Sequence, residues 1–242
     1  MANGDKSIFW GLAFIGIAVI IGTMIGSVAF YKVKSLDNTL SVTGSAKEKV
    51  TADTVKWTAS FSRIVSVLDI KSGYAQMAND QAVVEKFLKD AKIDAKAVTI
   101  SPVTMSEIYN NNNDNTPKQY TLSQTVQVQS DDVQGITTLA KNISPIIDKG
   151  VIFSNQSPEY YYSKLPEARV NLLSDAIKDA QNRASKIASS TGKKVGSLKS
   201  ASMGVVQVLQ ENSNDTADYG TYDTSTIDKE VMVVVKAEFV LQ

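Results

Sequence analysis

The stretch ARVNLLSDAIKDAQNRASKIASSTG, residues 168–192, constrains the fold more than any other part of the chain. Small or apolar residues recur in it at every fourth position: Ala168, Leu172, Ala176, Ala180, Ala184 and Ala188. This spacing puts them on one face of an α-helix, where small side chains let another backbone approach closely. Pro166 fits only the first turn of such a helix and Gly192 suits its left-handed end, so we predict a helix over residues 165–191. We expect this alanine stripe to pack on the protein's own sheet; a contact between subunits is the alternative.

Segments on either side of this helix alternate apolar and polar residues, as strands with one buried face do. In the last of them, Val231, Val233 and Val235 share one face with every second residue that follows. The predicted strands span residues 39–46, 55–62, 98–100, 120–128, 150–162, 195–210 and 231–241, and two further helices span 69–92 and 132–142. Their order predicts an α+β fold of mostly antiparallel sheets, with helices packed on one face and two roughly similar halves.

Two polar stretches predict loops between these elements. Asn110–Asn115 contains five Asn and one Asp, which favour turns, so we predict the tip of a hairpin there. Residues 211–226 are polar and poor in branched apolar side chains, which predicts a mobile loop between two hairpin strands. Pro102 predicts a bulge or a sheet edge, because proline lacks the N–H that a strand ladder requires.

The N-terminal segment differs in character from the rest of the chain. Residues 7–31, SIFWGLAFIGIAVIIGTMIGSVAFY, contain no charged side chain and are long enough to cross a bilayer as a helix. We therefore predict a short tail and a transmembrane signal anchor in residues 1–34, followed by an extracytoplasmic domain in residues 35–242. A cleaved signal peptide is the alternative, with a small-residue cleavage site at Ser27–Ala29.

Composition excludes several classes of function. The chain has 242 residues, no Cys and no His, and its 25 basic residues balance 25 acidic ones. Without imidazole or thiolate there is no Ser-His-Asp triad, Cys nucleophile or disulfide, and no ordinary zinc, haem or iron–sulfur site. Residues 1–34 hold three Lys and one Asp, so the remainder carries 22 basic and 24 acidic side chains. This balance argues against binding to nucleic-acid duplexes, which requires a basic surface. We expect no cofactor and no metal.

Several motifs suggest chemistry, but each also has a structural explanation. Ser190 and Lys193 have the S-x-x-K spacing of Ser–Lys acyl enzymes, yet they lie where a solvated helix C-cap is expected. Tyr160–Tyr162 would form an aromatic contact surface, or simply alternate across a strand. Gly22 and Gly26 match the small-xxx-small pattern of associating transmembrane helices. Oxygen ligands for Ca²⁺ are present without the spacing of an EF-hand: Asn212, Asn214, Asp215, Asp218 and Asp223. No pair of acids stands out, so we predict no catalytic, cofactor-binding or metal-binding residues.

A set of short segments recurs in a recognisable order over nearly all of residues 39–242. They are Val42–Gly44, Asp53, Ala91–Ile93, Thr99–Pro102, Tyr120–Val128, Gly150–Val151, Glu167–Arg169, the alanine stripe up to Gly192, Val195–Gly196 and Val231–Leu241. Together they resemble the SIMPL-domain family, the YggE-like envelope proteins of bacteria. Lys92 departs from the family pattern, which often has Gly at this position.

This resemblance implies an exported α+β domain that forms larger oligomers, including rings, and that serves envelope upkeep and stress tolerance. It supplies no catalytic residue and no cofactor. We therefore predict a non-enzymatic envelope protein that forms homo-oligomers or binds a protein partner. We expect a single pass through the bacterial inner membrane by residues 7–31, with the C-terminal domain in the periplasm or outside the cell, or a secreted protein if the segment is cleaved. The alternatives are an extracytoplasmic hydrolase that uses carboxylates or a Ser–Lys pair, and a module that binds a small ligand.

Overall fold

The computed structural model describes residues 4–35, 38–109, 117–213 and 215–242. The chain divides into two compact units, and each is assembled from separate segments of sequence. Unit 1 comprises Met1–Lys47, Val170–Val206 and Met232–Gln242, and unit 2 comprises Glu48–Arg169 and Gln207–Val231. The hairpin tip predicted at residues 110–115 lies outside the described residues.

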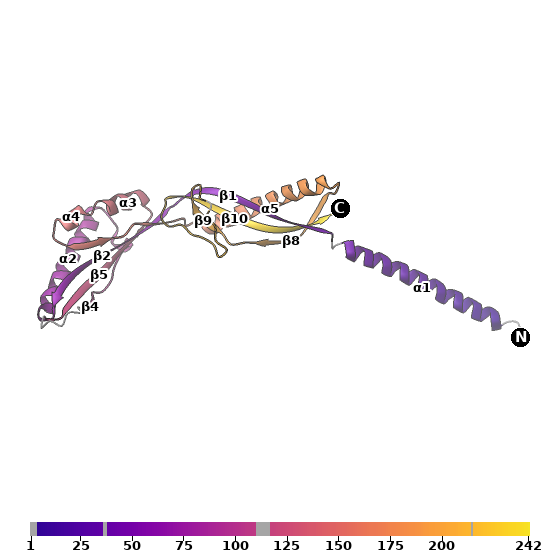
Figure 1. Ribbon diagram of the computed structural model, residues 1–242, viewed down its shortest axis with the longest axis horizontal. Helices are drawn as coiled ribbons and strands as arrows, with labels where there is room; N and C mark the ends of the chain where they lie inside the picture. Colours follow the sequence, from indigo (N-terminus) through magenta and orange to yellow (C-terminus); the bar gives the residue numbers. More distant parts are fainter. Residues whose placement is uncertain (1–3, 36–37, 110–116, 214) are drawn as a thin grey trace. The chain divides into compact units, whose positions relative to one another are not determined.

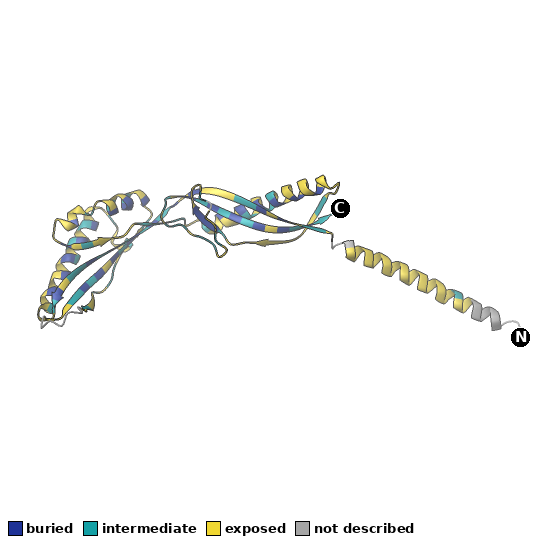
Figure 2. Ribbon diagram, viewed as in Figure 1, coloured by how far each residue is buried: buried dark blue, intermediate teal, exposed yellow. Residues whose placement is uncertain are grey.

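Helix α1 (Gly4–Ser35) contains the segment that is able to cross a membrane. Its residues Trp10–Lys34 have a mean hydropathy of 2.3, and none of this segment is buried against the protein. In Figure 2 the residues of α1 whose burial is described are coloured as exposed almost throughout. A helix of this length and composition matches the hydrocarbon core of a bilayer. The predicted apolar N-terminal helix is therefore confirmed, and it is consistent with a single-pass anchor or a signal sequence.

Unit 1 is built on a sheet in which β1 (Thr39–Thr51), β10 (Asp228–Leu241) and β8 (Val195–Met203) are neighbours in that order. β10 and β8 are antiparallel, and β9 (Gln207–Gln210) of unit 2 also pairs with β10. Helix α5 (Leu165–Ser190) runs along this sheet in Figure 1. On β10, Val233 and Val235 are fully buried, as their alternation predicts.

The alanine stripe of α5 packs on this sheet, as predicted. All of its residues are at most 4% exposed. Gly44 of β1 lies so close to α5 that a Cβ atom added to it would be 2.2 Å from the main-chain oxygen of Ala176. The Ser45 N–H donates a hydrogen bond to the carboxylate of Asp179 (2.9 Å), which also forms an ion pair with Arg183 at 2.8 Å. Close backbone approach therefore requires small residues on both elements.

Unit 2 is built on a six-stranded antiparallel sheet with the order β3-β5-β2-β6, in which β4 also pairs with β5 and β7 with β2. Its strands are β2 (Thr54–Ser66), β3 (Val98–Ile100), β4 (Thr104–Ile108), β5 (Gln119–Ser130), β6 (Ile152–Asn155) and β7 (Glu159–Tyr161). Its helices are η1 (Val67–Asp69), α2 (Ile70–Asp90), η2 (Ala95–Ala97), α3 (Val133–Lys141) and α4 (Ser144–Ile147).

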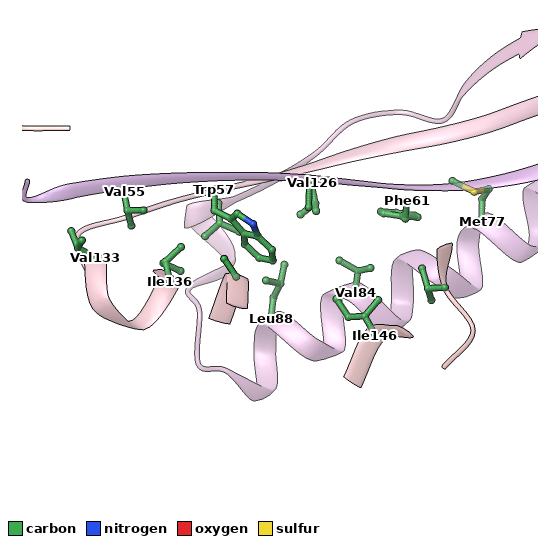
Figure 3. Packing of buried hydrophobic residues seen from close by; sticks show 14 of the residues in the cluster. Val55, Trp57, Phe61, Met77, Val84, Leu88, Val126, Val133, Ile136 and Ile146 are labelled. Carbon is green, nitrogen blue, oxygen red and sulfur yellow. The ribbon is translucent and has the colours of Figure 1, made fainter. Parts of the chain in front are cut away.

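The core of unit 2 lies between this sheet and helices α2, α3 and α4 (Figure 3). Trp57 and Phe61 of β2 pack among Met77, Val84 and Leu88 of α2, and none of these side chains is more than 3% exposed. Burial of one large apolar side chain contributes about 1.5–3 kcal/mol. Because the chain has no Cys, this packing holds the helices on the sheet without disulfides.

One strand, β4, was not predicted, and three of the predicted strands differ markedly in extent or continuity. β1 continues to Thr51, because Gly44 accommodates α5 and does not end the strand. The strand predicted over residues 150–162 is divided into β6 and β7 by a segment containing Pro158, which lacks a ladder N–H. The strand predicted over residues 195–210 is divided into β8 and β9 after Gly204, a residue type that weakens strand interiors.

The helices follow the prediction more closely. α2, α3 and α5 lie within two residues of their predicted ends, and Gly192 has the left-handed φ of 72° expected after α5. Lys92 has φ of 62°, a left-handed conformation that glycine adopts more readily than lysine. Pro145 lies in the first turn of α4, a short helix that the sequence analysis missed.

We expect Gly44→Ala to destabilise the folded protein, because the added methyl group would meet the backbone of α5. Overpacking of this kind costs about 1–3 kcal/mol. Urea unfolding of the full-length protein in detergent, followed by circular dichroism, measures the change. Gly204→Ala is a matched control, because its added Cβ would meet no atom closer than 3.5 Å. Equal unfolding midpoints for the two variants would contradict the close contact.

Candidate functional site

Strand β8 is an edge strand and is exposed on both faces. It pairs with β10 on one side, and within the described ranges no strand pairs with its other side. Every residue from Ser197 to Met203 is exposed. An edge strand presents a row of N–H and C=O groups that a strand of another chain can pair with. This edge is therefore a candidate interaction site.

The hydrogen bonds between β8 and β10 show which backbone groups of β8 face outward. The N–H of Gly204 donates to the main-chain oxygen of Val234 at 2.9 Å. Backbone groups alternate in direction along a strand, so those of Ser202 also face β10. The N–H and C=O groups of Ala201 and Met203 consequently point away from the sheet.

The two halves of β8 differ as edges. A shift in register opposite Glu238 marks a bulge in the first half, where Lys199 lies 3.7 Å from the Glu238 carboxylate. Bulges and charged side chains hinder edge-to-edge pairing. The second half, Ser200–Met203, has no charge and no proline, and Met203 is 40% exposed. The second half is the part of the edge that is open to pairing.

The sheet face beside this edge, opposite α5, is polar. A hollow of about 440 Å³ is lined by Ser41, Ser200, Ala201, Ser202, Lys236 and Glu238. The Glu238 carboxylate accepts hydrogen bonds from the hydroxyl groups of Thr39 (2.6 Å) and Ser200 (3.1 Å), and these bonds lower its pKa. This carboxylate is therefore already bonded within the sheet.

A second polar cluster lies in unit 2 around Asp223. Its carboxylate accepts hydrogen bonds from the N–H and hydroxyl groups of Ser225 and Thr226. The wholly buried side chain of Lys229 donates to the main-chain oxygen of Asp223 at 2.6 Å and lies 3.4 Å from its carboxylate. Burial lowers the pKa of Lys229. Burial also acts to raise the pKa of Asp223, but the bonds from Thr226 and Ser225 and the charge of Lys229 hold it well below its usual range.

This cluster anchors the chain that precedes β10. The N–H of Ala52 donates to the main-chain oxygen of Ile227, and that of Tyr160 to the oxygen of Thr224, both at 2.8 Å. The prediction of a mobile loop over residues 211–226 therefore requires correction, because hydrogen bonds hold its C-terminal part. Thr and Ser hydroxyl groups that bond a carboxylate three residues or fewer away stabilise such turns.

Two further carboxylates of unit 2 are occupied by internal donors. Asp53 accepts hydrogen bonds from the N–H and the hydroxyl of Ser163, both at 2.8 Å, and these outweigh the effect of burial and lower the pKa of Asp53. Asp80, which is 4% exposed, accepts two bonds from the guanidinium of Arg63 at 2.6 and 2.8 Å. Arg63 also donates to the main-chain oxygen of Gly150. These groups link elements of the fold.

The structure does not assemble the motifs suggested by the sequence into a reactive site. The Ser190 hydroxyl donates to the main-chain oxygen of Ile187 at 2.7 Å, and no hydrogen bond joins it to Lys193 in the described residues. The hydroxyl of buried Tyr160 bonds that of Thr137 at 3.0 Å, and the ring of Tyr161 packs against another tyrosine of unit 2.

The candidate Ca²⁺ ligands do not form a cluster of three acids among the described residues. Of these five residues, Asn214 lies outside the described ranges, and Asp223 is bonded as above. In the part of the chain that the structure describes, no three or more Asp or Glu side chains gather closely enough to hold a metal ion.

The sequence analysis missed both the buried Lys229 and the open edge of β8. A signal for Lys229 was present, because extending the inward row of Val231 and Val233 by two residues reaches position 229. No comparable signal marked β8, since its exposure depends on which strand pairs beside it.

Comparisons with known proteins give one extended match. Residues 40–239 match the model of a family described as SIMPL, protein of unknown function (DUF541). No curated protein matches the chain. The de novo designed protein Foldit4 is 13% identical with a TM-score of 0.22, over 43% of this chain and 93% of the design. A hydantoinase/carbamoylase family amidase from Burkholderia ambifaria is 14% identical with a TM-score of 0.23, over 47% of this chain and 29% of the amidase. Scores this low support no inference about fold or function.

We expect Asp223→Asn to lower the free energy of unfolding at pH 7, because it removes the carboxylate that faces the buried Lys229 ammonium. Breaking a buried ion pair costs about 3–5 kcal/mol. The pKa of Asp223 is depressed in the folded state, so its stabilisation is present above the unfolded pKa of about 4 and is lost as the pH falls below it. The difference between the two proteins should therefore shrink in acid.

Urea unfolding between pH 7 and pH 2 measures this difference. Asp215→Asn is the control, because Asp215 is an exposed residue of the same loop. A constant difference between wild type and Asp223→Asn at all pH values would contradict the assigned role of the carboxylate.

Proposed function

This chain belongs to the SIMPL family, and from that premise we propose that it is a membrane-anchored protein that self-associates through the open edge of β8 and acts without catalysis. The observation that carries the proposal is the outward direction of the backbone groups of Ala201 and Met203 on an edge strand exposed on both faces. Two such edges, one from each of two copies, would pair their N–H and C=O groups and cover the exposed side chains beside them.

A second copy is the occupant that fits this edge best. The residues Ser200–Met203 are small or flexible and uncharged, so two copies would meet without charge repulsion. Met203 would lose contact with water in the pair, which favours association. Lys199 and its bulge would limit pairing to this half of the strand, so that the contact has one register.

The proposal also covers where the protein acts. Helix α1 would hold it in the bacterial inner membrane in a single pass, with the remainder on the periplasmic or outer side. Anchoring confines the copies to two dimensions and raises their effective concentration, which favours a short contact. A role in envelope upkeep under stress, oxidative stress included, rests on the family resemblance alone.

A role without catalysis accords with how the polar groups of unit 2 are used. The carboxylates of Asp53, Asp80 and Asp223 each accept hydrogen bonds from residues of the same unit. A general acid or base has to reach a proton on a substrate, and its hydrogen-bonding capacity must be available for that contact. These groups are committed to holding strands and turns together.

We expect Ala201→Pro to reduce the mass of the full-length protein in detergent to that of the monomer. Proline removes an outward N–H and leaves the pairing of β8 with β10 intact, because the backbone of Ala201 does not face β10. Sedimentation equilibrium in density-matched detergent measures the mass. Ala201→Val, which keeps the N–H, is the matched control and should remain associated.

A companion variant tests whether the membrane helix, and not β8, carries the association. Replacing Gly22 and Gly26 with Ile should leave the oligomer intact if β8 carries the association. A monomeric wild type, or loss of association only in the Gly22 and Gly26 variant, would refute the role of β8.

A further inference from the structure

A groove in unit 2 lies between helix α2 and edge strand β3. It has a volume of about 610 Å³, and its apolar lining comes from Leu88 of α2, Ile93 of the following turn, and Val98 and Ile100 of β3. Leu88 is buried and the other three are half-buried. Such a groove is suited to apolar side chains of a partner, which would lose contact with water on entering it.

The strand that borders the groove has an unpaired edge. β3 pairs with β5, and in the described part of the chain no strand pairs with its other side. The N–H of Ser101 donates to the main-chain oxygen of Thr125 at 2.9 Å, so it faces β5. Because backbone groups alternate in direction, the N–H and C=O of Ile100 face away from β5, towards the open edge. A ligand that bonds the N–H and C=O of Ile100 would therefore supply backbone C=O and N–H groups of its own.

A buried acceptor near one end of the groove also lacks a donor. Gln124 is 4% exposed, and its amide nitrogen donates to the main-chain oxygen of Ser101 (2.9 Å) and to the side-chain oxygen of Gln81 (3.1 Å). Gln81 in turn donates to Glu85, which lines the groove. This relay fixes the orientation of the Gln124 amide and leaves its oxygen as a buried side-chain atom without a partner among the described residues. These hydrogen bonds also connect Glu85 on the rim of the groove to the chain at Ser101.

The rim of the groove carries two opposite charges. Glu85 lies at the end of the groove that is nearer to Gln81, with which it forms a hydrogen bond. Lys89 lies one helical turn further along α2, next to the turn that contains Ile93. Residues four apart on a helix are separated by about 6 Å along its axis. Residues two apart on an extended strand are separated by about 6.6 Å. A basic and an acidic side chain two residues apart on an extended peptide would therefore match Glu85 and Lys89.

We propose that this groove binds an extended peptide segment of a partner protein, which adds to β3 as a further strand and places apolar side chains between β3 and α2. The segment would carry a basic residue at the Glu85 end and an acidic residue two positions away, at the Lys89 end. Strand addition of this kind takes affinity from main-chain hydrogen bonds and specificity from alternate side chains. Pro102 follows β3 closely, so the added strand would be short. The site lies in unit 2 and does not depend on self-association through β8.

The test uses the full-length protein in detergent and a displayed library of random peptides about twelve residues long. We expect the enriched peptides to contain the basic and acidic pair two positions apart, with apolar residues at the flanking positions on the same face of the strand. The affinity of one such peptide, labelled with a fluorophore, is then measured by anisotropy. A library that yields no binder, or binders without this pattern, would overturn the proposal.

Two sets of variants locate the binding. Ile100→Pro removes the outward N–H without affecting the bonds to β5, and it should weaken binding at least about tenfold relative to Ile100→Val, which keeps the N–H. The double variant Glu85→Lys and Lys89→Glu should prefer a peptide with its two charges exchanged. Thermal unfolding by circular dichroism verifies that each variant is folded.

Equal affinities of Ile100→Pro and Ile100→Val, or an unchanged charge preference in the double variant, would refute the site. Enrichment only of peptides that copy segments of this chain would instead point to a second copy as the occupant, and would also refute it. Repeating the measurement with Ala201→Pro separates the two proposals. That variant should bind the peptide as the wild type does, whatever the outcome for self-association.

Discussion

The structure depends on one strand that is hydrogen-bonded along both edges and buried on one face. β10 pairs with β1, β8 and β9, and its inward row begins at Lys229 and continues through Val231, Val233 and Val235. A strand placed in this way has no freedom of register, because a shift by one residue would expose the whole row to water. The neighbouring strands take their positions from it. The position of α5 is fixed by the same sheet, since the small residues of its alanine stripe allow the helix backbone to approach the sheet backbone closely.

Periodicity allowed most of this fold to be predicted, because period-two and period-four patterns report which face of an element is buried. The range of α5 and the inward row of β10 both followed from such patterns. The bounds of other elements were predicted less well. The strand predicted over residues 39–46 continues to Thr51, and the small size of Gly44 within it serves the approach of α5. Pro145 lies beyond the helix predicted over residues 132–142 and opens the unpredicted helix α4. For Gly44 the decisive neighbour is distant in sequence, so no local pattern could identify it.

The candidate sites were harder to predict than the fold for a related reason. The polar residues that attract notice in the sequence, such as Asp223 and Tyr160, bond within unit 2. Among the described residues, backbone groups on the edges of the two sheets keep capacity for bonding, and β8 and β3 are two of these edge strands. Every residue has such groups, so the sequence does not distinguish those that are free from those that are paired. Only the strand order reveals them.

The burial of Lys229 also has a chemical consequence. Its amine is shielded from water and bonded to the Asp223 carbonyl, whereas the other lysines with described ion pairs are at least a third exposed. Acylating reagents attack the neutral, accessible form of an amine, so they would reach this one only when the surrounding turn opens. The rate at which Lys229 becomes acylated would then report how often the native protein opens locally around this residue. Lys229 thus serves as a chemical probe of how often the turn around it opens.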